Sequence, residues 1–198
     1  MKQIIVLIFI LVFANKSFSQ SEIDKQKIYS EVLKSFLVTK DTVKDCKFLV
    51  LDSTTAAQYP YQFHDSIYQK YFKIDKKDFD ASYNFMLQYI SFTKKFEAFP
   101  KELIKNDSLL LFKTDSVYSF FEESRKDKKA VEKCWGKFYH TIKCSGYCQF
   151  SKPYFMDKET AMIYFYEISG TSGSGWTYIF RKDGEKWRKV YQKLQWGS

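Results

Sequence analysis

The sequence lacks a second long apolar run, an internal repeat, a low-complexity linker and any recognisable catalytic, cofactor or nucleic-acid motif. Without a further apolar run, we expect no membrane-spanning helix after the N-terminus. Without a linker or repeat, residues 20–198 are best interpreted as one domain, long enough to bury a core without crosslinks. The missing motifs leave no catalytic residue, cofactor or nucleic-acid partner to name.

The N-terminus has the pattern of a cleavable export signal. Lys2 precedes an apolar run over residues 4–14, which is too short to cross a bilayer. Ser17 and Ser19 provide the small-x-small pattern that signal peptidase cleaves. We therefore expect residues 1–19 to be removed and the protein to be periplasmic or secreted. The absence of a cysteine at the cleavage point argues against a lipoprotein anchor.

The chain is basic and rich in aromatic residues. Its formal net charge of +9 falls to +7 when Lys2 and Lys16 are lost with the signal, which contains no acid. The basic residues are scattered, which favours a solubilising surface over attraction to an anionic envelope component. Aromatic residues make up 20% of the chain, a composition opposite to that of disordered proteins.

Apolar periodicity places helices early and a sheet late. The helical patterns cover residues 22–38, 65–72, 75–90, 115–121 and 131–142. Strand patterns cover residues 48–51, 109–112, 161–168, 176–180 and 187–196, with Val190, Leu194 and Trp196 on one face of the last strand. Asp183-Gly184 is a hairpin turn dipeptide. This order predicts an α+β domain with N-terminal helices packed on one face of a mainly C-terminal antiparallel sheet.

The chain resembles a family of exported Bacteroidota proteins that has no assigned activity. The matching C-terminal residues are Trp135, Phe138, Tyr139, Ser151, Phe155, Asp157, Ala161, Gly173, Gly175, Lys182, Trp187, Trp196, Gly197 and Ser198. Upstream matches are Tyr29, Leu33, Asp52, Ser53, Thr54 and Phe79. The chain departs from the family after Ser151, where Lys152 and Pro153 replace a basic residue and glycine, and in its four cysteines. The resemblance implies export and no particular reaction.

An even number of cysteines favours disulfides in an exported protein. The four are Cys46, Cys134, Cys144 and Cys148. The short spacing of the last two permits a local bridge, which would leave Cys46 to pair with Cys134. A zinc site formed by His140 together with Cys134, Cys144 and Cys148 is an alternative. However, Gly146 should end the helix that would align these ligands. A third interpretation is a nucleophilic cysteine with His140 as its base.

The stretch from Gly170 to Gly175 is rich in glycine and serine. Neither a phosphate-binding loop nor a nucleophile elbow fits, because both flanks are predicted strands. A flexible hairpin loop is the simplest interpretation, and a ligand-contacting loop formed by Gly173, Gly175 and Trp176 is the alternative. Aromatic strand residues are candidates for a sugar or peptide pocket as well as for the core: Tyr164, Phe165, Tyr166, Tyr178 and Phe180.

Three classes of function are compatible with this sequence. An exported binding or interaction module is favoured, because an export signal occurs without a convergent set of catalytic residue types. A small exported hydrolase, with a site assembled only in three dimensions, is the first alternative. An inhibitor or immunity-type protein, which captures one protein partner, is the second.

Overall fold

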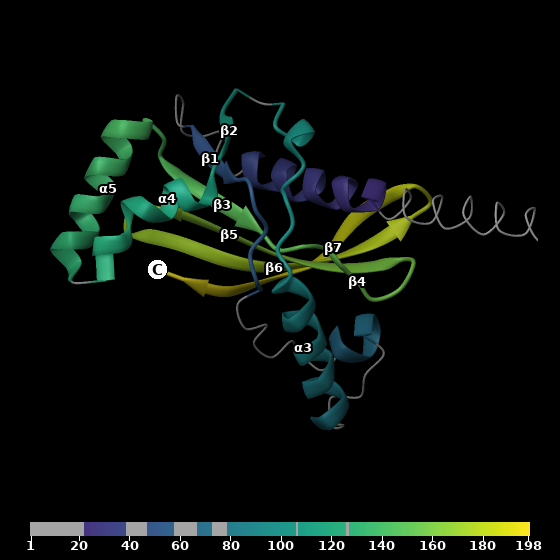
Figure 1. Cartoon of the computed structure of the whole chain (residues 1–198). Helices are drawn as coiled ribbons and strands as arrows, with labels where there is room; N and C mark the ends of the chain where they lie inside the picture. Colours follow the sequence, from purple (N-terminus) through teal and green to yellow (C-terminus); the bar gives the residue numbers. More distant parts are fainter. Residues whose placement is uncertain (1–21, 39–46, 58–66, 73–78, 106, 126) are drawn as a thin grey trace, which may run out of the picture.

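The computed structural model describes residues 22–38, 47–57, 67–72, 79–105, 107–125 and 127–198 (Figure 1). The predicted signal peptide and Cys46 lie outside these residues. The strands are β1 (Phe48–Leu51), β2 (Leu109–Phe112), β3 (Gly146–Phe150), β4 (Tyr154–Phe155), β5 (Thr160–Ser169), β6 (Ser172–Asp183) and β7 (Lys186–Gly197). The helical elements are helix 22–38, η1 (Tyr68–Phe72), α3 (Phe79–Thr93), η2 (Lys101–Leu103), α4 (Thr114–Phe120), η3 (Glu122–Arg125) and α5 (Lys128–Ile142).

The strands form one mixed sheet in the order β2-β1-β3-β5-β6-β7, with β4 paired to β5. β1 runs parallel to both β2 and β3. The remaining pairs are antiparallel, and they include the long meander β5-β6-β7. The predicted α+β class is therefore confirmed.

The helices are divided between the two faces of the sheet, whereas the sequence pattern placed them on one. Helix 22–38 lies on one side, and α3 lies on the other (Figure 1). Ile28, Val32 and Phe36 of this helix join the core on the first face. Tyr89 of α3, Val117 of α4 and Phe138 of α5 belong to the core on the second face.

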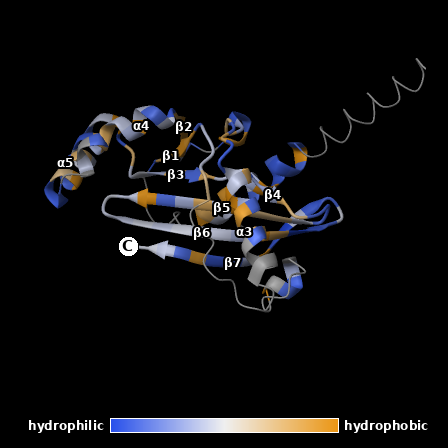
Figure 2. Cartoon of the chain, turned by 60° about the horizontal axis from the view of Figure 1, so that its bottom comes forward, coloured by the Kyte–Doolittle hydropathy of each residue, from blue (hydrophilic) through white to orange (hydrophobic). Residues whose placement is uncertain are grey.

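β5 is the strand on which both cores depend. Ala161, Ile163 and Phe165 point to the first face, and Met162 and Tyr164 point to the second. All five side chains are at most 2% exposed, which explains why this strand is apolar at consecutive positions. Outer elements have mixed composition instead: α5 and β7 each combine hydrophilic and hydrophobic residues (Figure 2).

Among the described residues, no helix combines the length and the apolarity that a bilayer crossing requires.

The buried tyrosines make stability sensitive to alkaline pH. Burial raises the pKa of Tyr164 to about 12, although the hydrogen bond from Trp196 opposes this shift. Burial also raises the pKa of Tyr166 well above its ordinary value. In the unfolded chain these phenols ionise near pH 10. Because the folded state keeps the protons of these tyrosines, they contribute to the free energy of unfolding. Their contribution is fully present below about pH 10 and is lost as pH rises toward 12.

We therefore expect the free energy of unfolding to fall steadily between about pH 10 and 12. Denaturant unfolding at several pH values, followed by tryptophan fluorescence, measures it. Tyrosinate absorbance should rise in two stages, first for exposed tyrosines and then together with unfolding. A single early rise in a chain that stays folded would contradict the expectation.

Candidate functional site

Helix 22–38 is fixed on the sheet by a buried carboxylate in its first turn. Asp24 Oδ2 accepts a hydrogen bond from Lys182 Nζ at 2.7 Å, and its Oδ1 accepts one from Trp187 Nε1 at 3.0 Å. Asp24 is only 8% exposed, so both contacts are largely screened from water. Lys182 and Trp187 pair across the β6-β7 hairpin. We call these three residues the Asp24 clamp.

The other end of the helix is fixed by aromatic packing. The Phe36 ring meets Phe48 of β1 edge-on, with ring centroids 5.2 Å apart, and contacts Phe165 of β5 at 5.3 Å. Beside this contact lies a hollow of about 310 Å³ between the helix and β5, β6 and β7. We call it the aromatic pocket, and its lining residues are Ser35, Phe36, Phe165, Glu167, Ser174, Trp176, Tyr178, Lys189 and Gln192.

The floor of the aromatic pocket consists of three rings from adjacent strands. Phe165 lies opposite Trp176, and the Phe165 and Tyr178 centroids are 6.5 Å apart. Trp176 Nε1 donates to Ser174 Oγ at 2.9 Å, and Ser174 Oγ donates to Glu167 Oε1 at 3.2 Å. These bonds orient the indole and give this end of the pocket a carboxylate.

The β7 wall supplies hydrogen-bond donors. Lys189 Nζ donates to Gln192 Oε1 at 2.7 Å and lies 5.2 Å from the centre of the Tyr178 ring. A lysine over an aromatic face is attracted by the ring quadrupole. Residues three apart in a regular strand would point to opposite faces. In the pairing of β6 with β7, the register shifts between Ile179 and Phe180, which leaves Val190 as an extra residue in β7. Because of this bulge, the side chains of Lys189 and Gln192 point to the same face of the sheet.

Burial raises the pKa of Tyr178 to about 12, and the negative charge of Glu167 acts in the same direction. Tyr178 therefore stays protonated at neutral pH. Its hydroxyl can donate a hydrogen bond, whereas a phenolate could not.

The structure separates the predicted ligand loop into two parts. Trp176 lines the aromatic pocket, as a stacking platform would, and Phe165 and Tyr178 from the candidate aromatic set join it. Gly173 and Gly175 belong to β6 rather than to a loop, and they face the opposite side of the sheet, under Trp196. A Cβ on Gly175 would overlap Trp196 Nε1 and lie 2.6 Å from the Tyr164 hydroxyl. These glycines make room for the Trp196 ring.

The predicted bridge between Cys144 and Cys148 is wrong. Cys148 lies in β3 and belongs to the core on the face of helix 22–38, whereas Cys144 belongs to the core on the other face. No two of the described cysteines, Cys134, Cys144 and Cys148, form a disulfide. The pairing of Cys46 with Cys134 involves a residue outside the described part of the chain.

The alternatives based on His140 are not supported by the geometry. Within the described ranges, no group of three His, Cys, Asp or Glu side chains is placed to hold a metal ion. His140 is exposed on α5, while Cys134 and Cys144 are buried. Burial raises the pKa of Cys144, which disfavours its thiolate.

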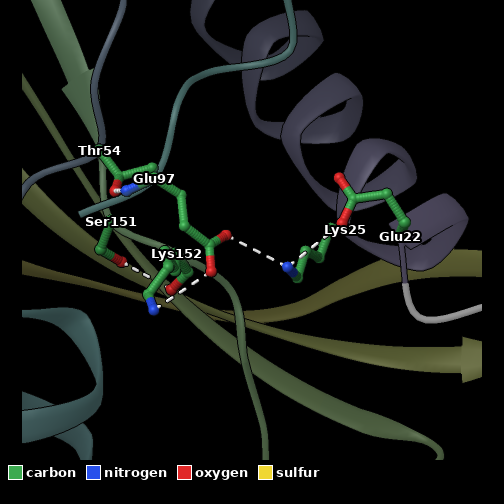
Figure 3. Close-up of polar contacts among 6 residues, drawn as sticks. All are labelled: Glu22, Lys25, Thr54, Glu97, Ser151 and Lys152. Atoms are coloured by element: carbon green, nitrogen blue, oxygen red, sulfur yellow. Dashed lines mark hydrogen bonds and ion pairs between the residues drawn. The ribbon is translucent and has the colours of Figure 1, made fainter. Parts of the chain in front are cut away.

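A separate cluster of charges joins helix 22–38, the segment around Glu97 and the start of the β4 region (Figure 3). Lys25 Nζ lies 3.2 Å from Glu22 Oε2 and 3.2 Å from Glu97 Oε2. Lys152 Nζ lies 3.3 Å from Glu97 Oε1 and 4.3 Å from the Phe92 ring centre. Glu97 is thus occupied by two lysines, and the cluster serves as a tertiary link between segments distant in the sequence.

Most residues of the aromatic pocket were missed by sequence reasoning. Glu167, Ser174, Lys189 and Gln192 carry no motif. One signal was available: Ser174, Trp176 and Tyr178 alternate along β6 and must share a face. The residues contributed by β7 have no such signal, because the bulge is not visible in the sequence.

Comparisons with protein-family models, with curated proteins and with solved structures found no match to this chain.

Loss of the clamp charge should destabilise the fold. Asp24→Asn keeps the shape but leaves the Lys182 ammonium without its carboxylate, so we expect unfolding free energy to fall by about 2–4 kcal/mol. Glu22→Gln in the same turn, whose side chain is 45% exposed, should cost less than about 1 kcal/mol. Urea unfolding of both variants measures the difference. Equal losses would contradict a special role for Asp24.

The charge cluster should respond asymmetrically to substitution. Glu97→Gln leaves the Lys152 ammonium buried without a carboxylate, whereas Lys152→Met leaves Glu97 still paired with Lys25. We expect about 3 kcal/mol of lost stability for the first and less than about 1.5 kcal/mol for the second. The double variant should resemble Lys152→Met alone, and chemical denaturation tests all three. If Lys152→Met lowered the stability more than Glu97→Gln, the Lys152 amine itself would be needed for stability.

Proposed function

We propose that this protein is an exported binding module, periplasmic or secreted, that holds a small ligand in the aromatic pocket. The observation that carries the proposal is the convergence of Trp176, Tyr178, Glu167 and Lys189 on one hollow. Ligand sites are typically concave, mainly apolar and furnished with a few placed polar groups. A volume of about 310 Å³ suits a small molecule rather than a folded partner.

The pocket is held in its shape before any ligand arrives. The Asp24 clamp fixes the helix that forms one wall, and hydrogen bonds orient Trp176, Ser174 and Glu167. A preformed site loses little conformational entropy on binding, which favours affinity.

Binding is favoured over catalysis by the bonding of the pocket groups. Ser174 donates to a carboxylate and accepts from an indole, rather than facing an imidazole or amine that would activate it. Lys189 likewise donates to the Gln192 amide. These partners fix the groups as recognition elements.

The family resemblance supports a shared architecture. Lys182 and Trp187, two residues that carry the resemblance, are the two partners of Asp24. We propose that relatives with these residues seat their first helix in the same way.

A ligand screen with matched tryptophan variants tests the proposal. Thermal-shift screening of small polar molecules with an apolar ring or side chain should give stabilising ligands. Trp176→Ala should weaken their binding about tenfold or more, because the stacking surface is lost. Trp135→Phe, on α5 at the other face, should leave affinity unchanged. Ligands that bind equally well to Trp176→Ala would place the site elsewhere.

A further inference from the structure

The polar groups of the aromatic pocket follow a fixed order along the sheet. Strand pairing places Glu167 opposite Ser174, then Phe165 opposite Trp176, then Tyr178 opposite Gln192. The Lys189 ammonium reaches this last row, where it bonds Gln192. One end of the pocket therefore carries a carboxylate and the other an ammonium, with the Trp176 ring between them.

The two ends also differ in hydrogen-bonding character. At the Glu167 end, the carboxylate can only accept hydrogen bonds. At the other end, Gln192 Oε1 is occupied by Lys189, which leaves the amide Nε2 and the remaining ammonium hydrogens as donors. A ligand complementary to both ends must carry a cationic donor group at one end and an anionic acceptor group at the other.

The length of the pocket limits the size of this ligand. Ser174 and Tyr178 are four residues apart on β6, a separation of roughly 13 Å along the strand. Glu167 Oε1 bonds Ser174 Oγ and Lys189 Nζ lies over the Tyr178 ring, so the two charges mark the ends of this separation. An extended chain of three residues spans roughly 10 Å between its termini.

Resting on the proposed function, we propose that the ligand is a short zwitterionic peptide with free termini. Its N-terminal ammonium pairs with Glu167, its C-terminal carboxylate binds Lys189 and the Gln192 amide, and a central apolar side chain stacks on Trp176. Two opposite charges at fixed spacing would select length and end groups, while the aromatic floor tolerates different side chains.

Calorimetric titration with end-modified peptides tests this inference. The probes are Ala-Xaa-Ala tripeptides, with Leu, Phe, Tyr or Val in the centre, each with free, N-acetylated or C-amidated ends. Free peptides should bind the full chain, and either modification should weaken binding about tenfold or more, because a charge-assisted hydrogen bond is lost. Acetylation should have little effect on Glu167→Gln, and amidation little effect on Lys189→Met. Lys186→Gln, an exposed β7 residue outside the pocket, is the matched control.

The outcomes separate this inference from the proposed function. End modifications without effect, or no binding by any peptide in the set, would overturn the inference. A neutral disaccharide that binds in a Trp176-dependent manner would also overturn it, yet would leave the pocket as the binding site. If peptides bound with the same affinity to the Trp176→Ala variant, both the peptide inference and the proposed function of the aromatic pocket would be overturned.

Discussion

The aromatic pocket depends on how firmly helix 22–38 is seated, and the seat is the Asp24 clamp. A buried carboxylate is costly unless it is paired and hydrogen-bonded. Asp24 meets both conditions, through Lys182 and Trp187, and its place in the first turn is also favoured by the helix dipole. Because both partners come from the β6-β7 hairpin, the clamp fixes the helix to the strands that carry the pocket floor. The aromatic contacts of Phe36 fix the other end of the helix, so the position of the helix along the sheet is defined at both ends.

The sheet serves two cores, and this explains several otherwise unrelated features. β5 is buried on both faces and is apolar throughout its centre. β6 divides its side chains, so that Ser174, Trp176 and Tyr178 face the pocket while Gly173 and Gly175 face Trp196. Trp196 Nε1 donates to the Tyr164 hydroxyl at 2.7 Å, which ties β7 to β5 behind the pocket floor. The glycines thus make room for Trp196 on the far side of the pocket floor.

Local patterns in the sequence predicted the local structure well. The stripe over residues 22–38, the interior strand β5 and the turn at Asp183-Gly184 all depend on neighbouring residues. The parallel pairing of β1 with β2 and β3 was not predictable, because it joins segments far apart in the sequence. The Cys144–Cys148 bridge failed for a related reason: spacing alone does not reveal that Cys144, which precedes β3, and Cys148, within β3, belong to cores on opposite faces of the sheet.

The pocket itself lies beyond sequence prediction because of two irregularities in β7. Alternation placed Val190, Leu194 and Trp196 on one face, which is wrong. Val190 and Gln195 are extra residues opposite the register shifts, so Leu194 lies opposite Trp176 while Trp196 covers Gly175 on the other face. Each bulge reverses the facing of the residues beyond it. The first brings Lys189 and Gln192 together, and the second carries Trp196 to the back of the floor. The arrangement of the aromatic pocket therefore follows from backbone irregularity as much as from residue identity.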